Sequence, residues 1–526
     1  MKKIDAPSLK AMINDGAELA LLDVREDGQF GEGHLLFANP LPYSVLESRV
    51  DARVPRRSTR VVLVDDADGV AEKAAVRLEA CGYSDVAILD GGVAAWQEAG
   101  YEIFKGVNVP CKAFGEVVEV SNHTPSISAE ELQAMFDAGD DLVVLDSRTP
   151  AEFNRMSIPN GINVPGAELA YRVHDLAPSP DTLVVVNCAG RTRSIIGAQS
   201  LINAGIDNKV VALRGGTQGW VLAGLELDHG ATAKYGDVST EGAAKAESVA
   251  ASVRARYGVK TIDRATLDAW RSETDERTLY IFDVRDLSEY EKGHLPGAIA
   301  APGGQLVQGT DVWMATRGAR VVLTDDNGVR AAMTAHWLLQ MRWDVYVLDD
   351  AGDLSERAAP ANNVLGLDDQ NIETIDPAAL AAELEAGTAV AVDVDLSLDY
   401  RKACLPGAIW AVRPRLPAAV TSLPADRKVV LYSEHETRAR LAVIDARGAT
   451  DAPVLVLKGG REAWTAAGLP TEPSPETPKD SDCIDFLFWV HDRHDGNEGS
   501  MRDYLAWEEQ LPAQIEADGD AQFRIP

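Results

Sequence analysis

One pattern occurs four times in the same order along this chain, and it constrains the fold more than any other feature. In each copy an apolar run ends in an aspartate, and these are Asp23, Asp146, Asp283 and Asp393. A turn follows eleven positions later, with the sequences Gly33-His34-Leu35, Ser157-Ile158-Pro159, His294-Leu295-Pro296 and Cys404-Leu405-Pro406. Ordered copies of this kind predict tandem domains of one small fold.

Each copy also places a polar residue after a second apolar run. These residues are Asp65, Cys188 and Asp325, each 42 positions after the aspartate, and Ser433, 40 positions after it. Two glycines and a tryptophan follow in three copies: Gly91-Gly92 with Trp96, Gly215-Gly216 with Trp220, and Gly459-Gly460 with Trp464. Short Val, Leu and Ile runs alternate with helical patterns, which indicates parallel sheets covered by helices.

Cys188 is the only thiol at this position in the four copies. It lies between the apolar run 183–186 and a helical pattern that begins at Ser194. Backbone N–H groups in such a loop stabilise an anion together with the helix dipole, so the loop favours a reactive thiolate. A small buried hydrophobe is the alternative, but Arg191 and Arg193 beside the thiol argue against it.

Together, the Asp-x-Arg sequence, the turn, the Cys188 loop and the Gly-Gly-x-x-x-Trp sequence resemble the rhodanese superfamily of sulfurtransferases. The resemblance covers nearly the whole chain except its C-terminal end. It implies an α/β fold of four tandem rhodanese-like domains, each a small parallel sheet flanked by helices, with an aromatic-rich C-terminal extension. We expect domains at 1–105, 121–235, 259–357 and 371–470, followed by the extension at 471–526.

The segments between the domains also carry structural signals. We predict an ordered strap at 105–119 and a connecting helix at 236–258. The extension is too apolar for a disordered end, and we expect it to dock on the domains or on another subunit. Its aromatic residues are Phe486, Phe488, Trp489, Tyr504 and Trp507.

The resemblance implies sulfur transfer through a persulfide on Cys188. The thiolate attacks the outer sulfur of thiosulfate or the sulfur of 3-mercaptopyruvate, and a small thiol, a protein thiol or cyanide then removes that sulfur. The predicted binding loop comprises Ala189, Gly190, Arg191, Thr192, Arg193 and Ser194. Its two arginines favour the doubly charged thiosulfate over mercaptopyruvate.

Further residues are candidates for supporting this loop. Asp146, Arg148 and Arg214 are possible neighbours of the binding residues, and we expect the Asp-x-Arg pair mainly to brace the loop. Cys111 is a resolving thiol only if the first linker passes Cys188, and an inert thiol is the preferred interpretation.

The other three copies are predicted to be silent. Carboxylates at Asp65 and Asp325 would repel an anionic donor, and Ser433 supplies no thiolate. We expect these copies to act as scaffold, shield or partner-binding modules. No cofactor and no metal are expected, because the five cysteines lack paired spacing and solvated acidic loops are commoner than cation sites.

Charge and hydropathy narrow the set of partners. The formal net charge of −32 opposes binding to nucleic acid and to anionic membranes. The chain has no apolar run of membrane-spanning length, and its N-terminus lacks the apolar core of a signal peptide, so we expect a cytoplasmic protein. Composition leaves the oligomeric state open.

Two alternatives to a turnover enzyme stay open. The first is a persulfide carrier or sensing module with little turnover, in which the silent copies recruit partners. The second is an oxyanion phosphatase or arsenate reductase. The second alternative fits less well, since only four residues separate Cys188 from Arg193 and such a short loop suits sulfur better than phosphate.

Overall fold

The computed structural model describes residues 1–350, 352, 354–360, 363–367 and 371–526. Residues 351 and 353 of the predicted third domain lie outside this set. The chain divides into two compact units. The first contains residues 1–10, 20–106 and 362–488, and the second contains 11–19, 107–361 and 489–526.

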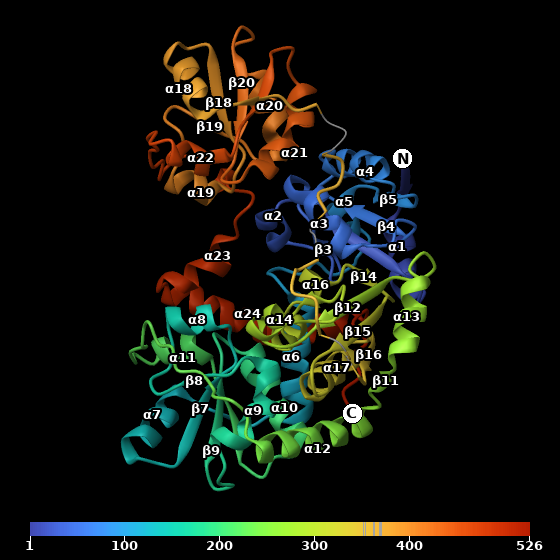
Figure 1. Cartoon of the computed structure of the whole chain (residues 1–526), viewed down its shortest axis with the longest axis vertical. Helices are drawn as coiled ribbons and strands as arrows, with labels where there is room; N and C mark the ends of the chain where they lie inside the picture. The colour runs from blue at the N-terminus through green and yellow to red at the C-terminus, as the bar shows by residue number, and fades with distance from the viewer. Residues whose placement is uncertain (351, 353, 361–362, 368–370) are drawn as a thin grey trace. The chain divides into compact units, whose positions relative to one another are not determined.

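The second unit contains two five-stranded parallel sheets (Figure 1). One has the order β6-β10-β9-β7-β8, formed by β6 (Ser126–Ile127), β7 (Leu142–Asp146), β8 (Ile162–Asn163), β9 (Leu183–Asn187) and β10 (Val210–Leu213). The other has the order β11-β16-β15-β12-β13, formed by β11 (Lys260–Ile262), β12 (Leu279–Asp283), β13 (Ile299–Ala300), β15 (Arg320–Thr324) and β16 (Asp344–Leu348).

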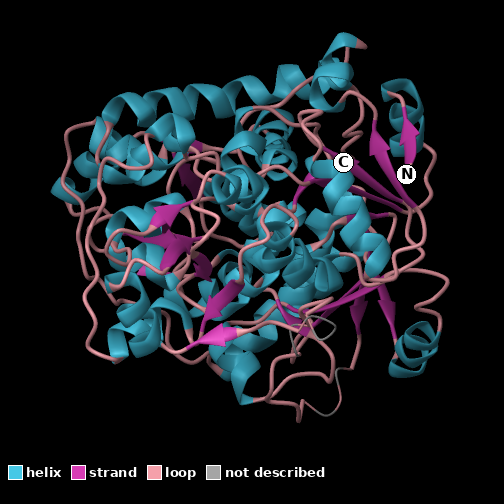
Figure 2. Cartoon of the chain, turned by 90° about the horizontal axis from the view of Figure 1, so that it is seen from above, coloured by secondary structure: helices cyan, strands magenta, loops and turns pink. Residues whose placement is uncertain are grey.

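Helices flank both sheets of this unit. Those of the first sheet are α7 (Ala129–Ala138), α8 (Pro150–Arg155), α9 (Leu169–Leu176), α10 (Thr192–Ala204) and α11 (Gly216–Leu222). Those of the second are α13 (Arg264–Ser272), α14 (Leu287–Lys292), α15 (Gly303–Gln308), α16 (Thr310–Trp313) and α17 (Val329–Gln340). Figure 2 shows strands and covering helices in separate colours.

The first unit repeats this plan twice. In one sheet β1, β5, β4 and β2 are consecutive neighbours and β3 pairs with β2; the strands are β1 (Lys2–Ile4), β2 (Leu19–Asp23), β3 (Asn39–Pro40), β4 (Val61–Val64) and β5 (Val86–Leu89). The other sheet has the order β17-β21-β20-β18-β19, formed by β17 (Thr374–Ile375), β18 (Ala389–Asp393), β19 (Ile409–Trp410), β20 (Lys428–Tyr432) and β21 (Val454–Leu457).

Helices also follow the strands of the first unit. Around one sheet they include α2 (Asp27–Glu32), α3 (Leu46–Arg53), α4 (Val70–Ala80) and α5 (Gly92–Glu98). Around the other they include α18 (Pro377–Glu385), α19 (Ser397–Lys402), α20 (Leu416–Thr421), α21 (Glu436–Arg447) and α22 (Gly460–Ala466). The predicted fold class is therefore confirmed: parallel sheets flanked by helices recur in order along the chain.

The repeated sequence features explain these elements locally. The apolar runs of β4, β9, β15 and β20 are buried almost throughout, as expected for central strands of covered parallel sheets. Helix α8 begins with a capping box in which Thr149 and Glu152 satisfy each other's backbone N–H groups. Both sequence and packing therefore place a loop directly after each of these central strands.

The second unit also contains helices that lie between the domains or after the last domain in the sequence. The predicted connecting helix is observed as α12 (Thr240–Tyr257), which packs along α9 and α17 (Figure 1). The predicted strap at 105–119 is wrong in form, because most of it belongs to helix α6 (Val109–Asn122), with Pro110 in its first turn. Helix α24 (Glu498–Asp518) packs on α6, so part of the extension docks on its own chain.

No helix among the residues described could cross a membrane.

Candidate active site

Cys188 directly follows β9, the middle strand of its sheet, at the edge where parallel sheets commonly bind ligands. The glycine pair of the repeat holds this loop. Gly216 has φ +55°, and a Cβ there would lie 2.3 Å from the Cys188 carbonyl oxygen. The N–H of Thr217 donates to the same oxygen at 2.9 Å. The glycine is thus required for the close approach that fixes the Cys188 backbone.

The thiol of Cys188 lies in a loop whose backbone N–H groups have no acceptor among the residues that the structure describes. Only 2% of the residue is exposed, and its Sγ lies 3.5 Å from the hydroxyl of Ser194. That hydroxyl donates to the Arg191 carbonyl at 2.8 Å. Across the described residues, no acceptor is bonded to the backbone N–H groups of 189–194. Helix α10 begins within this stretch, so its positive end also faces an anion bound here.

The other three copies fill the corresponding loop with a side-chain oxygen. In each, the residue at the position of Cys188 accepts a hydrogen bond from the N–H six positions later, where the active loop has Ser194. The pairs are Asp65 with Ala71 (3.0 Å), Asp325 with Ala331 (3.0 Å) and Ser433 with Ala439 (3.2 Å). In these loops the N–H group therefore has an acceptor within its own loop, whereas the corresponding N–H group of Ser194 has none among the described residues.

The Asp-x-Arg pair lies beneath the Cys188 loop. The Arg148 guanidinium donates to both carboxylate oxygens of Asp146, at 2.9 and 2.7 Å, and to the Met156 carbonyl at 2.7 Å. Asn187, which precedes Cys188, donates to Asp146 at 2.7 Å. All of these side chains are buried. The pair thus joins the end of β7 to the strand that carries the thiol.

Arg193 is held by a carboxylate of α8. Its guanidinium donates to Glu152 at 2.7 and 2.8 Å. Burial alone would raise the pKa of Glu152, but Arg193 and Thr149 lower it to about 2. Burial likewise opposes the charge of Arg193, yet Glu152, Cys188 and Asp146 together raise the pKa of this guanidinium. Arg193 therefore stays charged within electrostatic reach of Cys188.

Arg191 is turned toward carboxylates of two other helices. Its guanidinium donates to Glu116 at 2.7 Å and to Glu119 on α6, and to Glu509 on α24 at 3.1 Å. Burial raises the pKa of Glu116 to about 6 although Arg191 pulls it down. The structure thus brings Arg191 and Arg193 to the same loop but gives Arg191 three partners, and its contact with a donor stays a prediction.

Helix α24 also reaches the Cys188 loop, through Glu508. This carboxylate, 1% exposed, accepts from Lys112 at 3.0 Å and from the Thr192 hydroxyl at 3.4 Å. Lys112 also bonds to Tyr504 of α24. A Cβ placed on Gly190 would lie 3.3 Å from the second oxygen of Glu508. The C-terminal extension therefore forms part of the wall around the active loop.

Arg214 and Cys111 form hydrogen bonds with groups other than the Cys188 thiol. Arg214 is exposed and donates to the Ser126 hydroxyl at 3.3 Å. Cys111 is on α6, which does pass the active loop, since a Cβ on Gly115 would lie 2.7 Å from Thr192. Its own Sγ accepts from the Thr310 N–H at 3.2 Å, and burial raises its pKa to about 12. Cys111 therefore has the environment of an inert thiol.

A pocket of about 470 Å³ adjoins the active loop at Ala189. One side comes from the residues around α8, a second from α11, and a third from the C-terminal extension. The lining residues are Arg148, Glu152, Arg155, Met156, Ala189, Thr217, Gln218, Val221, Leu227, His229, Arg493, Gly496 and Met501.

A family model for the rhodanese-like domain matches residues 5–99, 128–223, 265–351 and 376–467. The chain belongs to the rhodanese-like domain family. The resemblance inferred from the motifs is thereby confirmed, with four rhodanese-like domains of which one has a cysteine at the active position.

Relatives support the same assignment. A crystal structure of a thiosulfate sulfurtransferase from Pseudomonas aeruginosa matches with TM-score 0.95 and 47% identity, covering 100% of both chains. A sulfurtransferase of Allochromatium vinosum is 30% identical over 101 residues, 19% of this chain and 92% of that protein. The chain is thus a rhodanese-type sulfurtransferase. An HTH-type transcriptional regulator of Mycobacterium tuberculosis is 33% identical over 112 residues, 21% of this chain and about half (48%) of the regulator.

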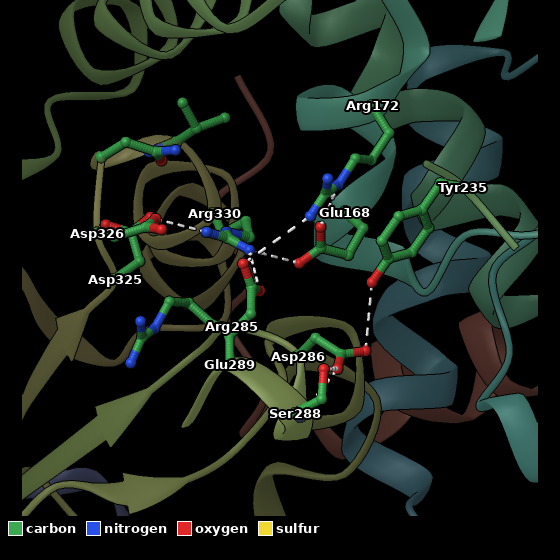
Figure 3. A network of polar contacts seen from close by, with 12 residues as sticks. Glu168, Arg172, Tyr235, Arg285, Asp286, Ser288, Glu289, Asp325, Asp326 and Arg330 are labelled. Carbon is green, nitrogen blue, oxygen red and sulfur yellow. Dashed lines mark hydrogen bonds and ion pairs between the residues drawn. The ribbon is translucent and has the colours of Figure 1, made fainter. Parts of the chain in front are cut away.

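The loop of the third rhodanese-like domain is closed by a network of charges (Figure 3). Arg330, fully buried, pairs with Glu168 at 2.9 Å, Glu289 at 2.6 Å and Asp326 at 2.5 Å. Glu168 precedes α9 of the second domain, and Arg172 of that helix also pairs with it, at 2.8 Å. The loop of the third domain is therefore occupied by ion pairs between the second and third domains.

The sequence did not indicate that Glu116 and Glu508 lie beside the Cys188 loop, or that Arg330 of the third loop pairs with Glu168. The first two lie on helices outside the domain that carries Cys188, and no local periodicity indicates which loop a helix will cover. Only the aromatic content of the extension signalled that this segment would pack against something.

Proposed function

We propose that this protein transfers a sulfane sulfur from an anionic donor, preferably thiosulfate, to a thiol or cyanide through a persulfide on Cys188. The observation that carries the proposal is the contrast among the four loops. In three of them a side-chain oxygen of the loop accepts from a backbone N–H group, whereas the Cys188 loop presents a thiol and N–H groups that have no acceptor among the described residues. The name of the Pseudomonas aeruginosa relative supports thiosulfate as the donor.

The proposed reaction has two displacement steps. The Cys188 thiolate attacks the outer sulfur of thiosulfate; a new S–S bond forms, the S–S bond of thiosulfate breaks, and sulfite leaves with that electron pair. An acceptor thiolate then attacks the outer sulfur of the persulfide. The second S–S bond breaks, an acceptor persulfide leaves, and the Cys188 thiolate is regenerated. Cyanide in the same step leaves as thiocyanate.

Each part of the loop has a proposed role. The N–H groups of Ala189 to Ser194 stabilise the terminal sulfur anion of the persulfide, because preorganised donors at a buried site stabilise developing charge. Arg193 attracts the donor, and Arg191 contributes positive charge from the opposite side of the loop. Asp146 and Arg148 hold the strand end beneath the thiol and stay unchanged during the reaction.

Intact-mass measurement tests this function. The protein is incubated with thiosulfate, with 3-mercaptopyruvate or with no donor, and we expect thiosulfate to add one sulfur atom that cyanide then removes. Cys188→Ser should gain no sulfur from either donor. A parent protein that acquires no sulfur would refute the proposal. Repeated turnover with a soluble thiol separates the enzyme from the carrier alternative, which predicts stoichiometric loading that only a protein partner discharges.

A further inference from the structure

The pocket beside the Cys188 loop is much larger than thiosulfate or cyanide requires. Its volume of about 470 Å³ compares with roughly 30 Å³ for one water molecule in the liquid, and it lies in the range of sites for organic ligands. Thiosulfate and cyanide have only a few non-hydrogen atoms. The size of the pocket therefore points to an organic molecule that approaches Cys188.

The lining indicates the chemistry of that molecule. Its charged side chains are three guanidinium groups, Arg148, Arg155 and Arg493, and the carboxylate of Glu152. Arg148 is paired with Asp146 beneath the loop, so Arg155 and Arg493 supply the positive charge of the pocket wall. Glu152 is paired with Arg193, so it contributes little repulsion toward an anion. Apolar walls come from Met156, Val221, Leu227 and Met501. The combination fits a carbon skeleton that carries a negative charge.

The C-terminal extension fixes one of these arginines in place. The Arg493 guanidinium carbon lies 3.4 Å from the centre of the Tyr504 ring, which is a cation–π distance. Tyr504 is 3% exposed and is bonded to Lys112 of α6, and Met501 on the same helix is 5% exposed. Arg493 thus lies on a packed aromatic platform at the wall of the pocket.

We propose that this pocket binds an anionic organic thiol as the sulfur acceptor, and that Arg493 of the C-terminal extension is a specificity-determining residue for it. The inference rests on the proposed function. In the transfer step the acceptor thiolate attacks the outer sulfur of the Cys188 persulfide, a new S–S bond forms, and the bond to Cys188 Sγ breaks with its electron pair left on that sulfur. Arg493 holds the acceptor's carboxylate and does not touch the reacting atoms.

Single-turnover discharge of the loaded full-length protein tests this proposal. The persulfide is formed with thiosulfate, its formation is verified by intact mass, and its loss is timed with mercaptosuccinate or with neutral 2-mercaptoethanol. We expect Arg493→Gln to lower the ratio of the two discharge rates about tenfold, and Arg493→Lys to restore part of it. Arg502→Gln is the matched control, because Arg502 lies exposed on α24 in a pair with Glu498 and does not line the pocket.

Each other outcome has a defined meaning. An unchanged ratio in Arg493→Gln, or an equal loss with both thiols, would overturn the proposal. Slower loading by thiosulfate with an unchanged ratio would assign the pocket to the donor and overturn it as well. If the parent protein never forms a persulfide, the proposed function fails. The pocket is then tested by calorimetric binding of mercaptosuccinate, which Arg493→Gln must weaken for this inference to stand.

Discussion

The loops that follow β9 and β15 have the same place in the fold and opposite contents. After β9, the loop holds the buried thiol of Cys188 and N–H groups with no acceptor in the described part of the chain. After β15, Asp325 accepts hydrogen bonds from the Gly328 and Ala331 N–H groups at 2.6 and 3.0 Å, and Arg330 closes the remaining space with three carboxylates. The comparison shows two contents for one backbone plan: in the third domain an internal carboxylate lies where we propose that the second domain holds the sulfur of its substrate.

The largest effect expected from this comparison is loss of activity in Cys188→Ser. Serine fills nearly the same space but supplies no thiolate at neutral pH, so sulfur transfer from every donor should fall to background. The measurement is the steady-state rate with thiosulfate and cyanide. Cys111→Ser is the control and should retain activity, because Cys111 is bonded to Thr310. Activity above a few per cent in Cys188→Ser would place the chemistry elsewhere.

The ion pairs that close the loop of the third domain should stabilise the folded protein. Arg330→Ala removes the cation that Glu168, Glu289 and Asp326 share. Glu168 keeps its pair with Arg172 and the other two carboxylates are partly exposed, so we expect a loss of about 1–3 kcal/mol in the free energy of unfolding. Urea unfolding followed by fluorescence should show a clearly lower midpoint. Arg502→Ala, which removes an exposed ion pair, should change stability by no more than about 1 kcal/mol. Equal midpoints for the two variants would mean that the network contributes nothing to the fold.

The two arginines of the active loop are expected to differ. Arg193→Ala should raise KM for thiosulfate by about an order of magnitude, which corresponds to loss of a charge-assisted contact of about 1.5–3 kcal/mol. Arg191→Ala should have a smaller effect on KM, because Glu116, Glu119 and Glu509 hold its guanidinium. Initial rates at several salt concentrations check this. A salt response that neither variant alters would show that both residues only brace the loop.

The fourth domain should show a pH dependence that the second lacks. There the arginine of the Asp-x-Arg pair is replaced by Asp395, and burial together with this neighbour raises the pKa of Asp393 from 3.8 to about 7. The folded state therefore binds this proton more tightly than the unfolded state. Protonated Asp393 therefore contributes to the stability of the folded state. This contribution is complete below pH 3.8 and is lost as the pH rises through about 7.

Thermal unfolding from pH 5 to pH 8 measures this contribution. We expect the transition of the fourth domain to fall with rising pH in the parent and to be flatter in Asp393→Asn. The Glu152 and Arg193 pair of the second domain should show the opposite sign, with stability lost only as the pH falls toward 2. If the unfolding temperature of the parent depends on pH no more steeply than that of Asp393→Asn, the raised pKa of Asp393 is contradicted.

The smallest expected effect concerns a double variant that should gain no sulfur-transfer activity. Asp325→Cys in a Cys188→Ser background should not restore sulfur transfer, because Asp326 lies beside the loop and Arg330 is engaged with three carboxylates. The measurement is again the steady-state rate with thiosulfate and cyanide, as for Cys188→Ser. Measurable turnover by the double variant would show that the silent loop lacks only a nucleophile.

The sequence was sufficient for the repeated parts of this structure. The apolar runs predicted the central strands, and the pattern at 195–204 predicted most of α10. The glycine pairs were recognised as part of the repeat, and the structure adds that Gly216 approaches the Cys188 carbonyl. These features are local, and each is set by its own few residues.

Contacts between distant segments were not predictable in this way. Thr192 and Glu508 are 316 positions apart, and Arg330 and Glu168 are 162 apart. Their pairing depends on how helices and domains pack, which neither periodicity nor charge count reveals. The strap predicted at 105–119 became α6 for a related reason: its apolar residues are buried against the domains of its unit, and that burial stabilises a helix.

The central claim is that only the Cys188 loop accepts sulfur, and peptide mapping of the intact protein tests it most directly. The protein is treated with thiosulfate, its thiols and persulfides are trapped by alkylation, and the peptides of all five cysteines are analysed by mass spectrometry. The account predicts an added sulfur on the peptide of Cys188 alone. An added sulfur on the peptide of Cys81, Cys111, Cys404 or Cys483 at comparable occupancy, or on none, would contradict it.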